Sequence, residues 1–323
     1  MRIESFDRKR ILIFLAIAFG IAWATALVIY LTGGLSNSPI VVPALKMNLA
    51  YLLMATSYMF APALAHILTR LVTREGWQGL WLKPRFKKAS RFWMIAWFLP
   101  GLLTVLGAAA FFYLFPGSFD ANLTNFRAQL QAASDIYGTE ESLSINPWLI
   151  LIIQLFQALI LAPILNAIPT FGEEFGWRAY LLPKLMPIGS KKAVLISGVI
   201  WGVWHWPVIL MGYNYGFDYP GTPWLGLLGM IWVTVGLAVI FSWLTLRSGS
   251  VWPAVIAHGA VNGIAAIGAL VVLGETNPLL GPTPVGIVGG LFFAILAINL
   301  LFHPIALKPS QLLELTELES DLP

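Results

Sequence analysis

The chain has 323 residues, of which 58% are hydrophobic and only 11% charged, and its mean hydropathy is +0.79. A soluble domain is about one quarter charged, so this composition excludes a soluble globular protein and indicates an integral membrane protein. The absence of cysteine excludes disulfide scaffolds, thiolate metal sites and cysteine nucleophiles, and the net charge of +4 comes from basic residues that flank apolar segments, so it does not predict nucleic-acid binding.

Eight segments are long and apolar enough to cross a bilayer, which takes about 20 residues. They predict an all-α, polytopic membrane protein that forms a single integral membrane domain over residues 1–323. The predicted spans are residues 11–31, 47–70, 92–115, 147–172, 191–211, 223–246, 251–273 and 284–305. The fourth contains Pro163 and Pro169 and leads directly into charged residues, so its boundaries are the least sharply defined.

The distribution of lysine and arginine predicts the orientation of these spans. With the N-terminus in the cytoplasm, 17 of the 19 cationic residues fall on the cytoplasmic side and only Lys46 and Arg127 fall outside. A wrong number of spans would scramble this partition. We therefore expect eight transmembrane helices with both termini cytoplasmic.

Two connections are long enough to have structure of their own. Residues 74–91 mix tryptophan with cations and are expected to lie along the cytoplasmic interface. Residues 116–146 form the longest polar stretch, in which Leu123, Phe126 and Leu130 predict one face of a short interfacial helix.

Ionisable side chains inside spans are costly and are functional candidates by default. Three clusters qualify: Glu173, Glu174 and Arg178 at the end of the fourth span, His205 in the fifth, and His258 with Asn262 in the seventh. His66 and His303 lie near the cytoplasmic ends of their spans and are interpreted as structural.

Helical spacing separates the roles within these clusters. Glu174 and Arg178 are four residues apart and are expected to form an ion pair, whereas Glu173 points about 100° away and has no cation on its own helix. A carboxylate in such a site suits a general base. His258 and Asn262 share a face for the same reason.

A purely structural role for these polar residues is the competing interpretation. Two glutamates at a helix end are often a solvated pair, and a lone histidine in a span is often a helix–helix hydrogen bond. Glutamate, histidine and asparagine on three separate helices, with few other buried ionisable groups, favour a functional site instead. Because the small residues beside them have GxxxG spacing, we expect the three helices to pack closely.

The ordered motifs Glu173-Glu174-x-x-x-Arg178, Trp201-x-x-x-His205 and His258-x-x-x-Asn262 resemble those of the CPBP intramembrane proteases, a family that includes the type II CAAX prenyl endopeptidases. The resemblance covers roughly residues 147–275. Trp201 stands where the family usually has phenylalanine, and Ala179 where glycine often follows the arginine. Neither change removes a catalytic group.

The resemblance implies an intramembrane endopeptidase that hydrolyses a peptide bond near the cytoplasmic side of the membrane. It assigns water activation to Glu173 with His205, oxyanion stabilisation to His258 and Asn262, and support of the site to Glu174 and Arg178. In a metal-dependent version, Glu173, His205 and His258 would bind Zn²⁺. The implied partners are the lipid bilayer and a hydrophobic or C-terminal peptide or protein, with no nucleic acid.

The expected location is a bacterial or archaeal cell membrane. Two other functions stay open from the sequence. One is a non-enzymatic immunity or scaffold protein, and the other is an ion-coupled transporter in which the same groups relay protons.

Overall fold

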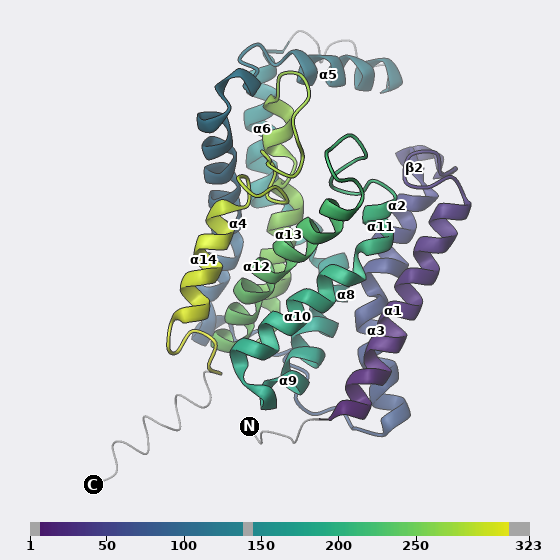
Figure 1. Ribbon diagram of the computed structural model, residues 1–323, viewed down its shortest axis with the longest axis vertical. Coiled ribbons are helices and arrows are strands. Elements are labelled where there is room, and N and C mark those ends of the chain that lie inside the picture. Colours follow the sequence, from purple (N-terminus) through teal and green to yellow (C-terminus); the bar gives the residue numbers. More distant parts are fainter. Residues whose placement is uncertain (1–6, 138–144, 310–323) are drawn as a thin grey trace.

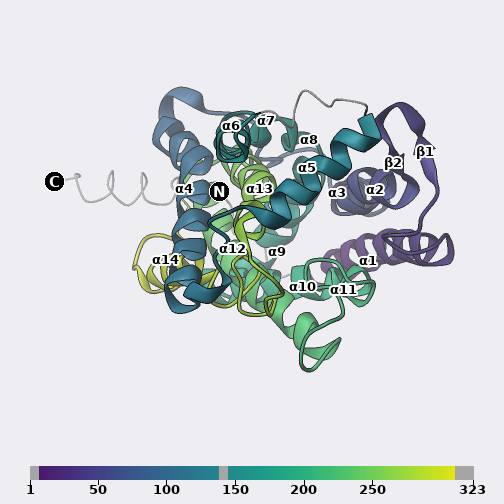
Figure 2. The same ribbon diagram turned by 90° about the horizontal axis from the view of Figure 1, so that it is seen from above.

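The computed structural model describes residues 7–137 and 145–309, and these form a bundle of helices (Figures 1 and 2). Within them, the only paired strands are the short β1 (Ile40–Val42) and β2 (Met47–Asn48). The prediction of an all-α, polytopic membrane protein is confirmed, because five helical segments are long and apolar enough to cross a membrane. These are Arg8–Leu31, Leu49–Thr73, Phe86–Leu114, Trp224–Ser248 and Trp252–Val271.

Three of the predicted spans correspond to single helices: α1 (Arg8–Leu31), α4 (Phe86–Leu114) and α12 (Trp224–Ser248). The second span is interrupted by a π-helical turn, Met54–Tyr58, between α2 (Leu49–Leu53) and α3 (Met59–Thr73). The seventh consists of α13 (Trp252–Ile264) followed by a 3-10 turn, Ile267–Val271. The eighth is shorter than predicted, because α14 comprises only Leu291–Phe302.

The fourth span is the most broken one. Its consecutive pieces are α6 (Pro147–Ile160), α7 (Ala162–Leu165), α8 (Ala167–Gly176), a π-helical turn (Trp177–Leu181) and α9 (Leu182–Leu185). Pro163 lies in the first turn of α7, where its missing N–H removes no helical hydrogen bond, so a new helix begins there. The helix thus continues well beyond residue 172, to Leu185.

The fifth span contains α10 (Ser190–Trp204) and α11 (Trp206–Leu210), separated by His205. Pro207 occupies the first turn of α11 and cannot donate to a preceding carbonyl, which accounts for the break. His205 therefore lies at a discontinuity between two helices and not in the middle of a regular one.

The bundle has two chemically different ends. Most lysines and arginines lie where α1, α4 and α10 begin and where α3 and α12 end, and we call this the basic end. The opposite end carries α5 (Thr124–Tyr137) and the segments 32–48 and 211–223 (Figure 1). The predicted short helix after the third span is present as α5, and its predicted apolar face packs with Leu151 of α6: Phe126 and the preceding Leu123 are buried, and Leu130 is partly buried.

Close helix contacts hold the central elements in place. α8 packs against α3, α10 against α12, and α13 against α4, α7 and α8. A Cβ on Gly176 of α8 would lie 2.6 Å from the carbonyl oxygen of Pro62, and one on Gly202 of α10 would lie 2.8 Å from the Cα of Ile231. The small residues therefore do permit close approach: Gly176 and Gly202 face α3 and α12, whereas Gly259 of α13 faces Pro163 of the fourth span, as expected for two of the three helices.

Candidate active site

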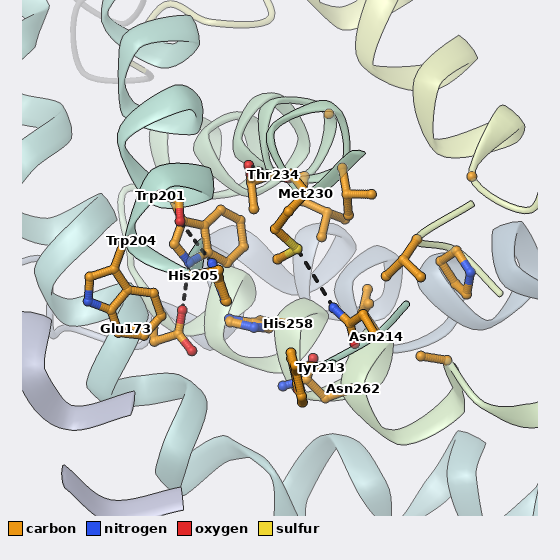
Figure 3. Close-up of a pocket in the computed structure, with 18 of the residues that line it drawn as sticks. Glu173, Trp201, Trp204, His205, Tyr213, Asn214, Met230, Thr234, His258 and Asn262 are labelled. Atoms are coloured by element: carbon orange, nitrogen blue, oxygen red, sulfur yellow. Dashed lines mark hydrogen bonds between the residues drawn. The ribbon is translucent and has the colours of Figure 1, made fainter. Parts of the chain in front are cut away.

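The four predicted catalytic residues come from three helices and line one cavity of about 640 Å³ (Figure 3). Glu173 lies on α8, His205 at the end of α10, and His258 and Asn262 on α13. Glu173, His205 and His258 are 3%, 8% and 5% exposed, so each reaches the cavity from an otherwise buried position. The structure thus brings together the set that the spacing and the resemblance singled out.

Trp201 is the residue around which this set is arranged. Its indole Nε1–H donates a hydrogen bond to Oε2 of Glu173 over 2.7 Å. Its ring lies 5.3 Å from that of His258 and 5.8 Å from that of His205, measured between centroids. A hydrogen bond to a carboxylate stabilises its charged form and fixes its orientation. Glu173 is therefore held by one oxygen, which leaves Oε1 for a reactant.

His205 is positioned by the break in the fifth span. Its Nδ1 lies 2.8 Å from the carbonyl oxygen of Trp201, one helical turn earlier. A carbonyl oxygen only accepts hydrogen bonds, so Nδ1 carries the proton and the neutral ring has an unprotonated Nε2. That nitrogen can accept a hydrogen bond from a molecule that enters the cavity.

Glu174 and Arg178 form the ion pair predicted from their spacing, with 3.2 Å between Oε2 and Nε, and both side chains are completely buried. The guanidinium of Arg178 also lies over the rings of Trp201 and Phe241, at 4.4 and 5.4 Å from their centroids. A cation over an aromatic face is stabilised by the ring quadrupole, most strongly when water is excluded. This pair lies directly beside the catalytic candidates.

Glu174 has a second partner that the sequence did not predict. Its Oε1 accepts a hydrogen bond from Nδ1 of His258 over 2.9 Å. The ring of His258 also lies between Trp201 and Phe241, whose centroids are 5.3 and 5.5 Å away. His258 is therefore fixed in tautomer and orientation, with Nε2 left for the cavity. The carboxylate stabilises the positive charge that this ring acquires on protonation.

The metal-dependent arrangement does not fit this geometry. Among residues 7–137 and 145–309, no three His, Asp or Glu side chains converge into a group that could hold a metal ion. The bonds to Trp201, to a backbone carbonyl and to Glu174 occupy Oε2 of Glu173 and Nδ1 of His205 and His258, so the atoms that remain for the cavity are Oε1 and the two Nε2 nitrogens. The steps below are derived for these side chains alone.

His66, interpreted from the sequence as structural, supports the site from below. Its Nδ1 lies 2.8 Å from the carbonyl oxygen of Phe175, the residue after Glu174, and its Nε2 accepts from Nε of Arg70 over 2.7 Å. The ring is fully buried. His66 thus links α8, which carries Glu173, to α3.

Comparison with known proteins supports the same region of the chain. Residues 147–264 match the family described as type II CAAX prenyl endopeptidase Rce1-like. A curated relative, CAAX prenyl protease 2 of Methanococcus maripaludis, is 30% identical over 93 residues, which are 28% of this chain and 34% of the relative. The match thus spans about one third of that relative's length. These matches confirm the resemblance to the CPBP intramembrane proteases, and the family match covers the part of the chain that contains all three motifs.

Proposed function

We propose that this chain, whose residues 147–264 match the Rce1-like family, is an intramembrane endopeptidase in which Glu173 activates the attacking water. The observation that carries this proposal is the convergence of Glu173, His205, His258 and Asn262 on one cavity within a helical bundle. Peptide hydrolysis needs a base, donors for an oxyanion and a proton for the leaving amine, and these four side chains supply all three.

The first step places a water between two acceptors. Oε1 of Glu173 and Nε2 of neutral His205 each accept from one of its protons, because their other polar atoms bond to Trp201. Glu173 removes a proton as the water oxygen attacks the carbonyl carbon, and the carbonyl becomes a tetrahedral oxyanion. The hydrogen bond from Trp201 favours the ionised form of Glu173 and fixes the orientation of its carboxylate.

Collapse of this intermediate breaks the C–N bond. Nδ2 of Asn262 donates to the oxyanion, and Nε2–H of protonated His258 donates beside it, since Glu174 balances the charge of the ring. The proton held by Glu173 passes to the departing amine, which leaves Glu173 ionised again. Glu174 and Arg178 touch no reacting atom and act as positioning residues.

The proposal is tested by Glu173→Gln with purified protein and a hydrophobic test peptide. Loss of the base is expected to reduce cleavage by about 10²- to 10⁴-fold. Glu275→Gln is the matched control, because it makes the same carboxylate-to-amide change at an exposed position outside the cavity. Full activity of Glu173→Gln would overturn the proposal.

We further propose a hydrophobic peptide or protein segment as the substrate and a bacterial or archaeal cell membrane as the location. The cavity wall is largely apolar and lies within a membrane bundle, which suits a substrate that partitions into the bilayer. A scaffold function predicts instead that Glu173→Gln leaves the cellular phenotype intact, and a transporter predicts solute flux in proteoliposomes.

A further inference from the structure

We propose that the hydroxyl of Tyr213 donates a third hydrogen bond to the oxyanion formed in peptide hydrolysis, beside Asn262 and His258. The inference rests on the proposed function, because that reaction supplies the oxyanion. Tyr213 lies outside the three sequence motifs, in the turn that follows α11. Its assignment depends on its place in the cavity, on its free hydroxyl and on the turn that holds its ring.

Tyr213 lines the same cavity as the four catalytic candidates. Figure 3 shows its side chain there, together with those of His258 and Asn262. The residue is 39% exposed, and this surface includes the part that lines the cavity, so a bound molecule can reach the ring.

The hydroxyl of Tyr213 is not used by the fold. Among the residues that the structure describes, it has no hydrogen-bond partner. Tyr58 also lines the cavity, but its hydroxyl donates to the carbonyl oxygen of Trp204 over 2.6 Å. Tyr51, the remaining phenol of the lining, is 66% exposed and is therefore less shielded from its surroundings. Tyr213 is thus the inner phenol of the cavity whose donor is left for a ligand.

The backbone holds Tyr213 in place through a hydrogen-bonded turn. Its N–H donates to the carbonyl oxygen of Val208 over 3.0 Å, and its own carbonyl oxygen accepts from the N–H of Tyr215 over 2.9 Å. The residues on either side, Gly212 and Asn214, have φ angles of 90° and 67°, a region that glycine and asparagine tolerate best. A side chain presented from a fixed turn loses little conformational freedom when it binds a ligand.

Glu173 is close enough to act on Tyr213 electrostatically. Removal of the ring from bulk water and, next, the negative charge of Glu173 raise the pKa of Tyr213 to about 12. No hydrogen bond joins the two side chains among the described residues, and Oε2 of Glu173 is bonded to Trp201 instead. The phenol is therefore neutral near pH 7, and it can donate a hydrogen bond to a molecule bound beside Glu173.

The oxyanion is the acceptor that this free donor fits. When water activated by Glu173 attacks, the carbonyl oxygen gains a negative charge and attracts donors that are already in place. Asn262 and His258 supply two donors in the proposed mechanism, and Tyr213 supplies another. Its proton stays on the phenol throughout, so the proton balance of the reaction is unchanged. A bond that strengthens only as the charge develops raises kcat and leaves substrate binding nearly unaltered.

The test compares the kinetics of wild type, Tyr213→Phe and Tyr215→Phe on one hydrophobic peptide. Tyr215→Phe is the matched control, because it removes the same atom from the same turn. That hydroxyl bonds to the carbonyl oxygen of Val285, and its side chain does not line the cavity. Loss of a bond to a charged acceptor predicts that kcat falls about 10- to 150-fold in Tyr213→Phe, while KM changes by less than about twofold. Tyr215→Phe is expected to lower Tm and to keep the kcat of wild type.

A second measurement separates stabilisation of the oxyanion from a structural effect. A peptide phosphinate has a negatively charged tetrahedral centre that resembles the intermediate. We expect Tyr213→Phe to weaken its binding by the same factor as kcat, about 10- to 150-fold. Binding of the uncleaved peptide, measured in a Glu173→Gln background, is expected to change by less than about twofold. If Tyr213→Phe is not recovered as folded protein, Tyr213→Met replaces it, with the same losses expected.

The outcomes distinguish this inference from the proposed function. An unchanged kcat in Tyr213→Phe overturns the role of Tyr213, and so does a rise in KM alone, which would make the hydroxyl a contact of the bound substrate only. Equal loss of kcat in Tyr215→Phe also overturns it, because the turn as a whole would then be responsible. Wild-type protein that cleaves no peptide, or Glu173→Gln that cleaves normally, refutes the proposed peptidase mechanism and this inference with it.

Discussion

Glu174 and Arg178 form a buried ion pair in which Glu174 has a second partner of opposite charge and Arg178 has none among the described residues. This difference predicts the result of a double-mutant cycle. Within residues 7–137 and 145–309, Glu174 is the carboxylate that pairs with Arg178, whereas Glu174 also accepts a hydrogen bond from His258. Removing one partner of a buried pair costs about 3–5 kcal/mol of unfolding free energy, because the other charge is left uncompensated. We expect Glu174→Leu to lose this amount and Arg178→Met to lose less, since His258 can still neutralise Glu174.

The double variant Glu174→Leu/Arg178→Met separates stability from chemistry. It leaves no uncompensated charge, and buried ion pairs replaced by apolar side chains are often neutral in stability. We therefore expect it to be more stable than Glu174→Leu alone, yet inactive, because His258 has lost the carboxylate that fixes Nδ1. The free energies are measured by equilibrium unfolding in mixed micelles and the activity by peptide cleavage. A double variant that is no more stable than Glu174→Leu would refute this account of the pair.

Three further predictions address other contacts. Trp201→Phe keeps an aromatic ring but removes the N–H that donates to Glu173. A hydrogen bond to a charged group contributes about 1.5–3 kcal/mol, so we expect kcat/KM to fall about 10- to 150-fold with little change in Tm. An unchanged kcat/KM would show that this bond does not orient the base. Gly176→Ala places a Cβ 2.6 Å from the carbonyl oxygen of Pro62, and we expect it to destabilise the fold by about 1–3 kcal/mol. Gly20→Ala is the control, because a Cβ there has nothing within 4 Å and should leave the stability unchanged. Equal unfolding free energies for the two variants would contradict the close packing of α3 on α8. Treatment with a zinc chelator is expected to leave cleavage intact, and loss of activity that added Zn²⁺ restores would revive the metal-dependent arrangement.

Contacts between side chains of one helix could be predicted from the sequence, because the fixed rise and turn of an α-helix determine which residues share a face. The pair of Glu174 and Arg178 is such a relation, and the structure contains it. The grouping of Glu173, His205 and His258 was also anticipated, since costly polar residues in membrane spans tend to meet. Most of the spans were located by the same kind of argument, from hydropathy alone.

Hydrogen bonds between different helices could not be predicted in this way. The bond from His258 to Glu174 joins residues 84 positions apart, and the bond from Trp201 to Glu173 joins two different spans. Trp201 was interpreted as a conservative aromatic replacement, because spacing alone does not show where an indole N–H points. Pro163 and Pro207 lie next to the breaks in the fourth and fifth spans, where proline is a local signal, but the π-helical turn at Trp177–Leu181 has no comparable signal.

The end of α10 has a mechanical consequence for the cavity. The carbonyl oxygen of Trp204, its last residue, accepts hydrogen bonds from the hydroxyl of Tyr58 over 2.6 Å and from Nε1 of Trp23 over 3.2 Å. The first, second and fifth spans are thus joined by hydrogen bonds to one carbonyl oxygen, immediately before the break at His205. A rotation of α11 about that point would move Tyr213 and Asn214, which line the cavity, while the bond from His205 to Trp201 stayed in place. The fixed end of α10 and the break before α11 thus meet at His205, the residue proposed to hold the attacking water.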